Sequence, residues 1–128
     1  MMNYTIWNNC LCALVFLTAG AGWSPLRADE EISFNAHIRP ILNKYCTSCH
    51  GGVKRAADIS FVYAETVLPP VGWIVEPGDP DSSVLIERVT TEDPDLRMPP
   101  PDEHPEPLAA EEVTLLSRWI AEGATWGK

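Results

Sequence analysis

The sequence of 128 residues has few basic residues, few cysteines and no long apolar run. Nine Lys and Arg stand against 18 Asp and Glu, and the resulting net charge of −9 makes nucleic acid an improbable partner. The apolar run at residues 10–21 is shorter than the roughly 20 residues that cross a bilayer. Internal repeats, basic runs and glycine-rich phosphate loops are absent as well. These absences leave a small single domain with no nucleotide-binding or nucleic-acid-binding signal.

Residues 1–28 are predicted to be a cleaved secretory signal peptide. Their apolar stretch has the length of an h-region, and small residues precede two candidate cleavage points, after Ala21 or after Ala28. Cleavage after Ala28 is favoured and leaves one domain, residues 29–128. Because the n-region lacks Lys and Arg, an uncleaved membrane anchor is the alternative. The prediction is a periplasmic or otherwise exported protein, with membrane contact only if the leader is uncleaved.

The four cysteines fall into two groups. Cys10 and Cys12 lie in the predicted leader, whereas Cys46, Cys49 and the adjacent His50 form the motif C-x-x-C-H, which is typical of c-type haem attachment. Two thiols at this spacing can join two vinyl groups on one edge of a porphyrin. The imidazole that follows them can become an axial ligand of the iron. No mature thiol remains for a structural disulfide.

Two other readings of the motif are a zinc half-site and a dithiol redox pair. A zinc site would need a fourth ligand from His37 or His104, and neither lies at a zinc-finger spacing. A thioredoxin-like redox pair would need a βαβ pattern, which the sequence lacks. The motif therefore predicts one haem c per chain, held by Cys46 and Cys49 with His50 on the iron.

Apolar periodicity predicts two helices around this motif. Residues 32–45 carry apolar side chains at three- and four-residue steps, with Ser33 as N-cap, although Pro40 must lie in the first turn or kink the helix. A second helix is predicted after residue 79, with Asp79 as its N-cap and Pro80 at its first position.

The second half of the chain combines irregular segments with one clear helix. Residues 53–76 contain runs too short to predict a sheet. Residues 90–107 form a long loop whose prolines exclude helix and central strand. Residues 109–122 have one apolar stripe and precede Gly123, so they predict a helix that stops there.

Five blocks of the sequence together resemble the planctomycete-type cytochrome c domain. The blocks are Phe34-x-x-His37-Ile38-Arg39-Pro40-Ile41-Leu42, the haem motif with Gly51, Glu76-Pro77-Gly78-Asp79-Pro80 leading to Ser83-x-Leu85, Arg97-Met98-Pro99-Pro100, and Glu112 through Trp119-Ile120 to Gly123-Ala124-x-Trp126. The resemblance implies an all-α, small cytochrome c fold, with three or so helices around one covalently bound haem and a long Pro-rich loop. It also implies that the first and last helices pack crosswise near the haem, with His50 as proximal ligand and Met98 as distal ligand.

The sequence also supports Met98 as the distal ligand. It is the only methionine beyond the predicted leader, and Pro99 biases it toward an extended backbone. The alternatives are a methionine that merely fills a hydrophobic gap, or iron ligation by His104 or His37. The neighbouring Arg97 is expected either to approach a haem propionate or to lie solvated in the loop.

The sequence thus predicts an exported monohaem c-type cytochrome that carries single electrons between protein redox partners. With protein ligands on both sides of the iron, no small-molecule substrate should reach it, and the chain is not expected to be an enzyme. Residues 29–128 hold 8 basic and 18 acidic residues, because the leader removes only Arg27, and one interpretation of this acidity is a redox partner with a basic docking surface. A merely soluble exported surface explains the acidity more simply. The alternative function is a haem-containing docking or redox-sensing module for a larger exported protein assembly.

Overall fold

The computed structural model describes residues 31–127 of the chain. The predicted leader and its two candidate cleavage points lie outside these residues. Within the described part the regular structure is helical and no strand forms, as the all-α prediction requires. No helix of this part is long and apolar enough to cross a membrane. The elements in chain order are η1 (Phe34–Ile38), α1 (Arg39–Tyr45), η2 (Ala56–Asp58), η3 (Ala64–Thr66), α2 (Val84–Thr90) and α3 (Ala110–Ala121).

The first helix begins directly after Ser33, as predicted. The Ser33 hydroxyl accepts a hydrogen bond from the Ala36 N–H at 3.3 Å, which satisfies one of the free amides of the first turn. The Ser33 N–H in turn donates to His37 Nδ1 at 3.0 Å. This pair of bonds resembles a capping box in which an imidazole replaces the usual Glu or Gln. His37 therefore fixes the start of the helix.

Pro40 does not kink this helix, because a wide π-helical turn precedes it. In η1 the Arg39 N–H donates to the carbonyl of Phe34, five residues earlier. Pro40, which has no N–H, then lies at the beginning of α1, where that hydrogen bond is not needed. The continuous helix buries Phe34, Ile38 and Leu42 on its inner face.

The second helix begins later than predicted, at Val84 with Ser83 as its N-cap. The Asp79 carboxylate caps a separate turn, since it accepts hydrogen bonds from the Ser82 N–H at 3.1 Å and the Ser82 hydroxyl at 2.8 Å. Ser83 is buried, and its hydroxyl lies between the Glu76 N–H at 2.9 Å and the Asp79 carbonyl at 2.8 Å. These side-chain hydrogen bonds hold Ser83 in an extended conformation and prevent a helix that starts at Pro80.

The last helix matches its prediction to within one residue at each end. It spans Ala110–Ala121, and Gly123 adopts a φ of 100°, the left-handed conformation that commonly ends a helix. Its buried side chains are Leu116, Trp119 and Ile120. The stripe that these residues form faces the first helix and α2.

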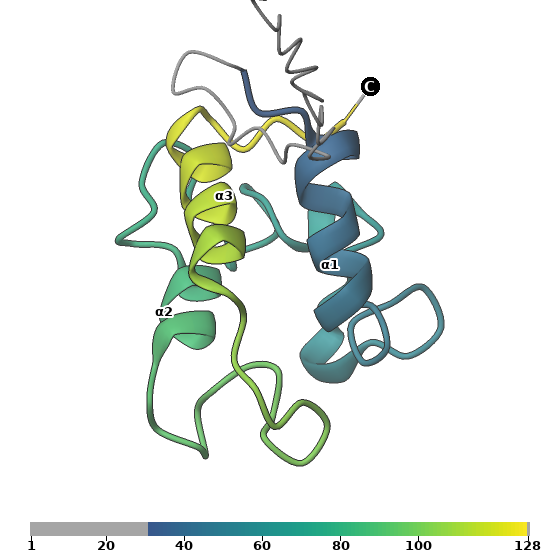
Figure 1. Cartoon of the computed structure of the whole chain (residues 1–128). Coiled ribbons are helices and arrows are strands. Elements are labelled where there is room, and N and C mark those ends of the chain that lie inside the picture. Colours follow the sequence, from purple (N-terminus) through teal and green to yellow (C-terminus); the bar gives the residue numbers. More distant parts are fainter. Residues whose placement is uncertain (1–30, 128) are drawn as a thin grey trace, which may run out of the picture.

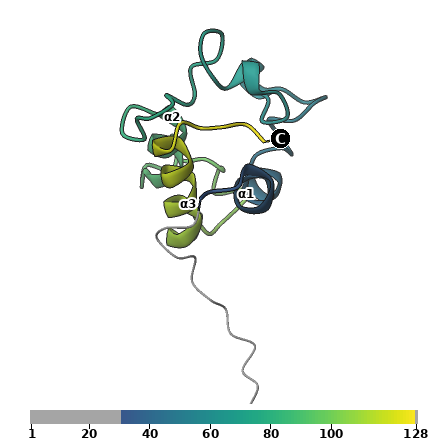
Figure 2. The same ribbon diagram turned by 90° about the horizontal axis from the view of Figure 1, so that it is seen from above.

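An aromatic junction joins the first and last helices. In Figures 1 and 2, α2 and α3 lie on one side of the molecule, α1 lies on the other, and the segment after α3 runs back toward the first helix. The Phe34 ring lies 4.5 Å from that of Trp126 and 5.7 Å from that of Trp119, centroid to centroid. The Trp119 Nε1–H donates to the Thr125 carbonyl at 3.0 Å. Trp119 and Trp126 therefore act as core aromatics.

We expect Trp119→Ala to lower the free energy of unfolding by about 3–5 kcal/mol, because Trp119 is only 2% exposed and fills the centre of the junction. Denaturant unfolding of the whole protein measures this loss. The exposed Val62 provides the control, and Val62→Ala should change the free energy by less than about 0.5 kcal/mol. Equal effects of the two substitutions would show that the junction does not support the fold.

Candidate haem site

One cavity of about 430 Å³ brings the four predicted site residues together. Cys46, Cys49, His50 and Met98 all line it. Its volume lies within the range of about 300–1,000 Å³ that is usual for cofactor and ligand sites. Apolar side chains from α2 and from the segment before it form much of the wall; among them are Ile59, Phe61, Ile74, Val84, Leu85 and Val89.

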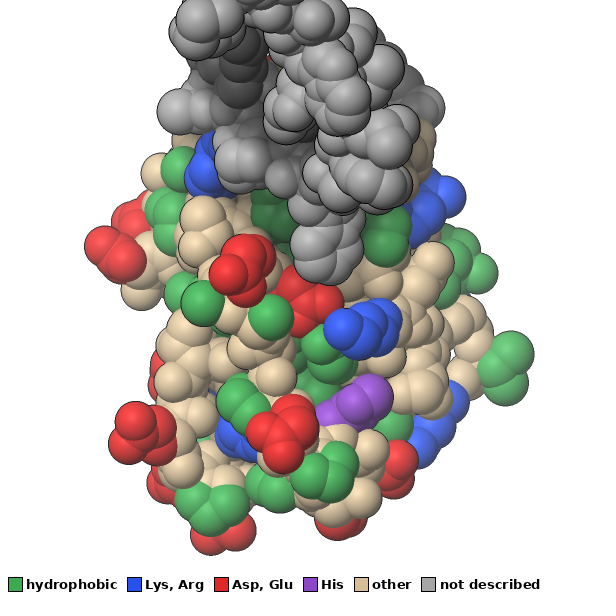
Figure 3. Space-filling model, viewed as in Figure 1, with side chains coloured by type: hydrophobic (Ala, Val, Ile, Leu, Met, Phe, Trp, Pro, Cys, Tyr) green, Lys and Arg blue, Asp and Glu red, His purple; other side chains and the backbone are tan. Residues whose placement is uncertain are grey.

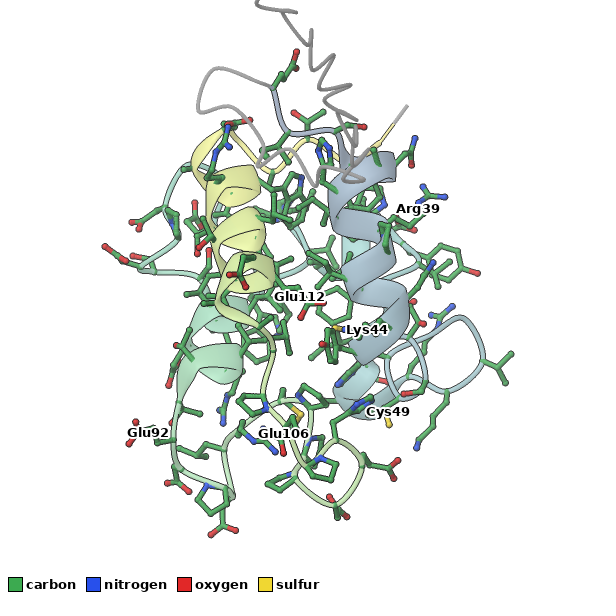
Figure 4. The ribbon with its side chains drawn as sticks, in the orientation of Figure 1. Arg39, Lys44, Cys49, Glu92, Glu106 and Glu112 are labelled. Carbon is green, nitrogen blue, oxygen red and sulfur yellow. The ribbon has the colours of Figure 1, made fainter. Side chains whose placement is uncertain are left out.

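The Cys-x-x-Cys-His motif forms a tight turn at the end of α1. The Cys46 N–H donates to the Leu42 carbonyl at 2.8 Å, and the His50 N–H donates to the Cys46 carbonyl at 2.8 Å. One more helical turn thus follows α1, and residues four apart share a helix face. This turn brings the two thiols and the imidazole to the same cavity. Figure 4 shows Cys49 just beyond the end of α1.

Gly51 lets the chain reverse immediately after the motif. A Cβ at this position would collide with the Thr47 carbonyl oxygen, so the close approach admits only glycine. The Gly51 N–H donates to the Lys54 carbonyl at 2.7 Å, and the Phe61 N–H donates to the His50 carbonyl at 2.8 Å. The chain that returns after Gly51 therefore fixes the backbone of His50 through the bond from Phe61.

The ring of His50 is fixed in one orientation. Its Nδ1 lies 3.0 Å from the Ala56 carbonyl oxygen, and since a carbonyl only accepts, Nδ1 carries the hydrogen. The Phe61 ring packs against the imidazole at 5.9 Å with an interplanar angle of 87°. This tautomer leaves Nε2 with a free lone pair, the state that an imidazole needs as a metal ligand.

The two thiols lie in different surroundings. Burial raises the pKa of the Cys46 thiol to about 12, so this group stays protonated near neutral pH. The Lys54 ammonium donates a hydrogen bond to the Cys49 thiol, with its Nζ 3.4 Å from the Cys49 Sγ. Neither thiol is in a disulfide, so both are free for attachment.

Met98 reaches the same cavity from the segment between α2 and α3. Residues 91–109 contain neither helix nor strand, and the Met98 N–H donates to the Arg88 carbonyl of α2 at 2.8 Å. The Met98 side chain is 39% exposed and lines the cavity. A residue 48 positions after His50 thus lies at the same site as His50, as the prediction of a distal ligand requires.

The comparisons with known proteins agree with this geometry. Residues 46–102 match the family model described as planctomycete cytochrome C. This match supports a planctomycete-type cytochrome c domain in this part of the chain. The match confirms the resemblance found in the sequence, and its ends enclose the haem motif and Met98. No curated protein and no solved structure matches the chain.

A cytochrome c domain is, in general, a haem-binding electron carrier, and the cavity fits that group. Its walls are largely apolar, two free thiols lie on one turn, and one imidazole presents a free nitrogen. Nowhere in residues 31–127 do three His, Cys, Asp or Glu side chains gather to bind a metal. A haem iron receives four ligands from its porphyrin, so the protein has to add only the axial ones.

The two alternative histidine ligands have different positions in the structure. His37 does not line the cavity and accepts the Ser33 N–H at the start of the first helix. His104 does line the cavity, with its ring 5.4 Å from that of Tyr45. His104 therefore remains the residue that could replace Met98 at the iron.

Arg97 is neither solvated nor free. The expectation of a solvated loop arginine is wrong, because Arg97 is only 8% exposed and its guanidinium donates to the His104 carbonyl at 2.8 Å and the Pro105 carbonyl at 3.3 Å. No pattern in the sequence indicates these bonds, or the Ala56 carbonyl that orients His50. Backbone acceptors have no residue signature.

A carboxylate links α1 and α3 next to Tyr45, which lines the cavity. Glu112 accepts hydrogen bonds from the Tyr45 hydroxyl at 2.7 Å, the Lys44 ammonium at 3.0 Å and the Ala109 N–H at 3.0 Å. Figure 4 shows Glu112 and Lys44 pointing toward one another from the two helices. Burial raises the pKa of the Glu112 carboxyl, but these hydrogen bonds outweigh burial and leave the pKa below its ordinary value of 4.5. The ionised carboxylate thus holds Tyr45 against His104.

We expect Glu112→Gln to lower the free energy of unfolding at pH 7 by about 1–2 kcal/mol, because hydrogen bonds to a charged acceptor are lost. The folded-state pKa of Glu112 is lowered, so its contribution is present above the unfolded pKa and is lost as the pH falls through the folded pKa. The difference between the wild type and the variant should therefore shrink below pH 4.5. Denaturant unfolding over a pH series measures this.

The control for this experiment is the exposed neighbour Glu111, and Glu111→Gln should leave the pH profile of stability unchanged. A difference between the wild type and Glu112→Gln that persists unchanged in acid would contradict an ionised carboxylate at Glu112.

Proposed function

We propose that the chain is an exported monohaem c-type cytochrome that carries single electrons, with His50 and Met98 as the axial ligands of one haem. The observation that carries this proposal is the gathering of Cys46, Cys49, His50 and Met98 around one apolar cavity. Among these, His50 has its Nδ1 hydrogen committed to a backbone carbonyl and its Nε2 free.

Each residue has a separate part in this function. Cys46 and Cys49 would each form a thioether with a vinyl group and so fix the haem on the motif turn. His50, oriented by Ala56 and Phe61, would bind the iron through Nε2. Met98 would supply a weak, uncharged sulfur from the loop. The bound haem supplies a one-electron change between ferric and ferrous iron, and the apolar walls keep water from it.

The proposed carrier would not be an enzyme, because His50 and Met98 would hold the iron from its two sides and leave no place for a substrate there. A docking or redox-sensing module would use the same haem and the same ligands. The two functions differ in how fast the haem exchanges electrons with a soluble redox protein. Stopped-flow mixing of the reduced protein with an oxidised soluble redox protein separates them, because a carrier reacts rapidly in both directions.

Charge on the described residues supports docking to a basic partner. On the face shown in Figure 3, Asp and Glu side chains gather over α2, α3 and the loop between them, while most Lys and Arg lie on the α1 side. Residues 32–57 contain four basic residues and no acidic one. The acidic surface over α2, α3 and the loop between them would attract a basic protein and orient it for electron transfer.

The experiment that tests export and attachment is expression with a periplasmic haem-attachment system, followed by measurement of the intact mass. Thioether formation in bacteria takes place outside the cytoplasm, so an attached haem also reports export. A mass equal to residues 29–128 plus one haem supports cleavage after Ala28. A mass without haem would contradict the proposed function.

We expect the double substitution Cys46→Ala and Cys49→Ala to leave haem that acid solvent extracts completely, because no other thiol lies beyond the predicted leader. Each single substitution should leave at most one thioether. Thr47→Ala is the matched control, since Thr47 lies on the same turn but does not line the cavity. Covalent haem in the double variant would refute attachment at this motif.

We expect Met98→Ala to open the ferrous iron to carbon monoxide, and Met98→His to lower the reduction potential clearly, because a thioether favours the ferrous state relative to a second imidazole. Absorption spectra with carbon monoxide and a redox titration measure these effects. Leu96→Ala is the control, because Leu96 is exposed on the same loop and does not line the cavity. An unchanged potential and low-spin spectrum in Met98→Ala would exclude Met98 and make His104 the next residue to replace.

A further inference from the structure

Arg97 is a buried cation whose hydrogen bonds go to backbone carbonyls. Within residues 31–127 the ion pairs are Lys44–Glu112 and Arg118–Glu122, so Arg97 has no carboxylate partner there. Burial of an unpaired charge is costly unless hydrogen bonds replace its hydration. The carbonyls of His104 and Pro105 supply that replacement. A side chain held at such cost next to a proposed iron ligand requires an explanation.

The two hydrogen bonds of Arg97 close a small loop. They connect residue 97 to residues 104 and 105, and the enclosed stretch begins with Met98 and continues through Pro99, Pro100 and Pro101. Inside the loop, the His104 N–H donates to the Pro100 carbonyl at 2.9 Å. The loop is thus a closed unit, and Met98 is its first residue after Arg97.

Only the start of this unit is attached to α2. The Met98 N–H donates to the Arg88 carbonyl, and the Arg88 guanidinium donates to the Leu96 carbonyl at 3.3 Å. Among the described residues, 99–105 make no backbone hydrogen bond to a helix, and the His104 ring packs 5.4 Å from that of Tyr45 in α1. The Arg97 bonds are thus the side-chain link that ties the far end of this stretch back to residue 97.

We propose that Arg97 is a positioning residue that holds Met98 against the haem by fastening residues 104 and 105 to residue 97. This inference rests on the proposed function, in which Met98 is the distal ligand. A weak, uncharged sulfur stays on iron only if its backbone is held in place, since the bond itself contributes little. Arg97 would supply this restraint without touching the haem.

The guanidinium suits this task better than an ammonium would. Its planar fork presents several N–H groups in fixed directions, and one nitrogen of Arg97 reaches both carbonyls. A lysine keeps the charge, but its ammonium rotates at the end of a flexible chain and does not hold its N–H groups in fixed directions. Arg97→Lys therefore tests geometry at constant charge, and Arg97→Gln removes the charge as well.

The test compares haem-loaded Arg97→Lys, Arg97→Gln and Met98→Ala with the wild type. We expect the two Arg97 variants to retain covalent haem and far-ultraviolet dichroism. We also expect them to bind carbon monoxide about tenfold faster than the wild type, to weaken the absorption band of a ferric iron–thioether bond, and to lower the reduction potential. Arg39→Lys and Arg39→Gln are the controls, because Arg39 is exposed on the first helix and lies away from the cavity. They should match the wild type.

Each outcome decides between the inference and the proposed function. If Met98→Ala opens the iron while both Arg97 variants behave as the wild type, the inference is overturned and the proposed function stands. If Met98→Ala itself has no effect, the distal ligand is another residue and the inference fails with it. If both Arg97 variants lose haem while Met98→Ala retains it, Arg97 supports the whole domain rather than Met98, and the inference is again overturned.

Discussion

Packing of Phe34 against Trp119 and Trp126 is the contact on which the rest of this structure depends. It joins the first helix to the last at one end, and the Glu112 carboxylate joins them again near the other, through Tyr45 and Lys44. A domain of this size buries limited apolar surface, so few contacts can hold its helices in place. The cavity lies beyond the second junction, where the motif turn, α2 and the loop after α2 meet.

The two sides of the candidate site are built in different ways. The side with His50 is local, because one turn of chain places both thiols and the imidazole, and Ala56, six residues later, orients the ring. The side with Met98 is not local. It depends on a proline-rich segment without helix or strand, which α2 holds at Arg88 and which closes on itself through Arg97. In the proposed function, a strong, covalent and local attachment on the His50 side would thus face a weak ligand, Met98, whose position depends on tertiary contacts.

The sequence predicted well what neighbouring residues decide. The Ser33 cap, the end of the last helix at Gly123 and the motif turn all depend on residues within one turn of one another. The start of α2 was predicted wrongly, because Asp79 and Pro80 have the local signature of a helix start. The buried Ser83 hydroxyl bonds instead to Glu76 and Asp79, and these bonds delay the helix to Val84. The expectation that Arg97 lies solvated in the loop was wrong for a similar reason, because its guanidinium binds two backbone carbonyls.

By itself, the sequence determined the chemistry of this protein: a C-x-x-C-H motif, one methionine beyond the predicted leader, and the blocks that mark a cytochrome c domain. The proposed covalent attachment depends on spacing along the chain, so residue order is enough to predict it. Only the tertiary structure decided that Met98 shares a cavity with His50, which tautomer His50 adopts, and where the Arg97 guanidinium binds. Those outcomes depend on backbone carbonyls and on segments far apart in the chain, and a carbonyl belongs to every residue type alike.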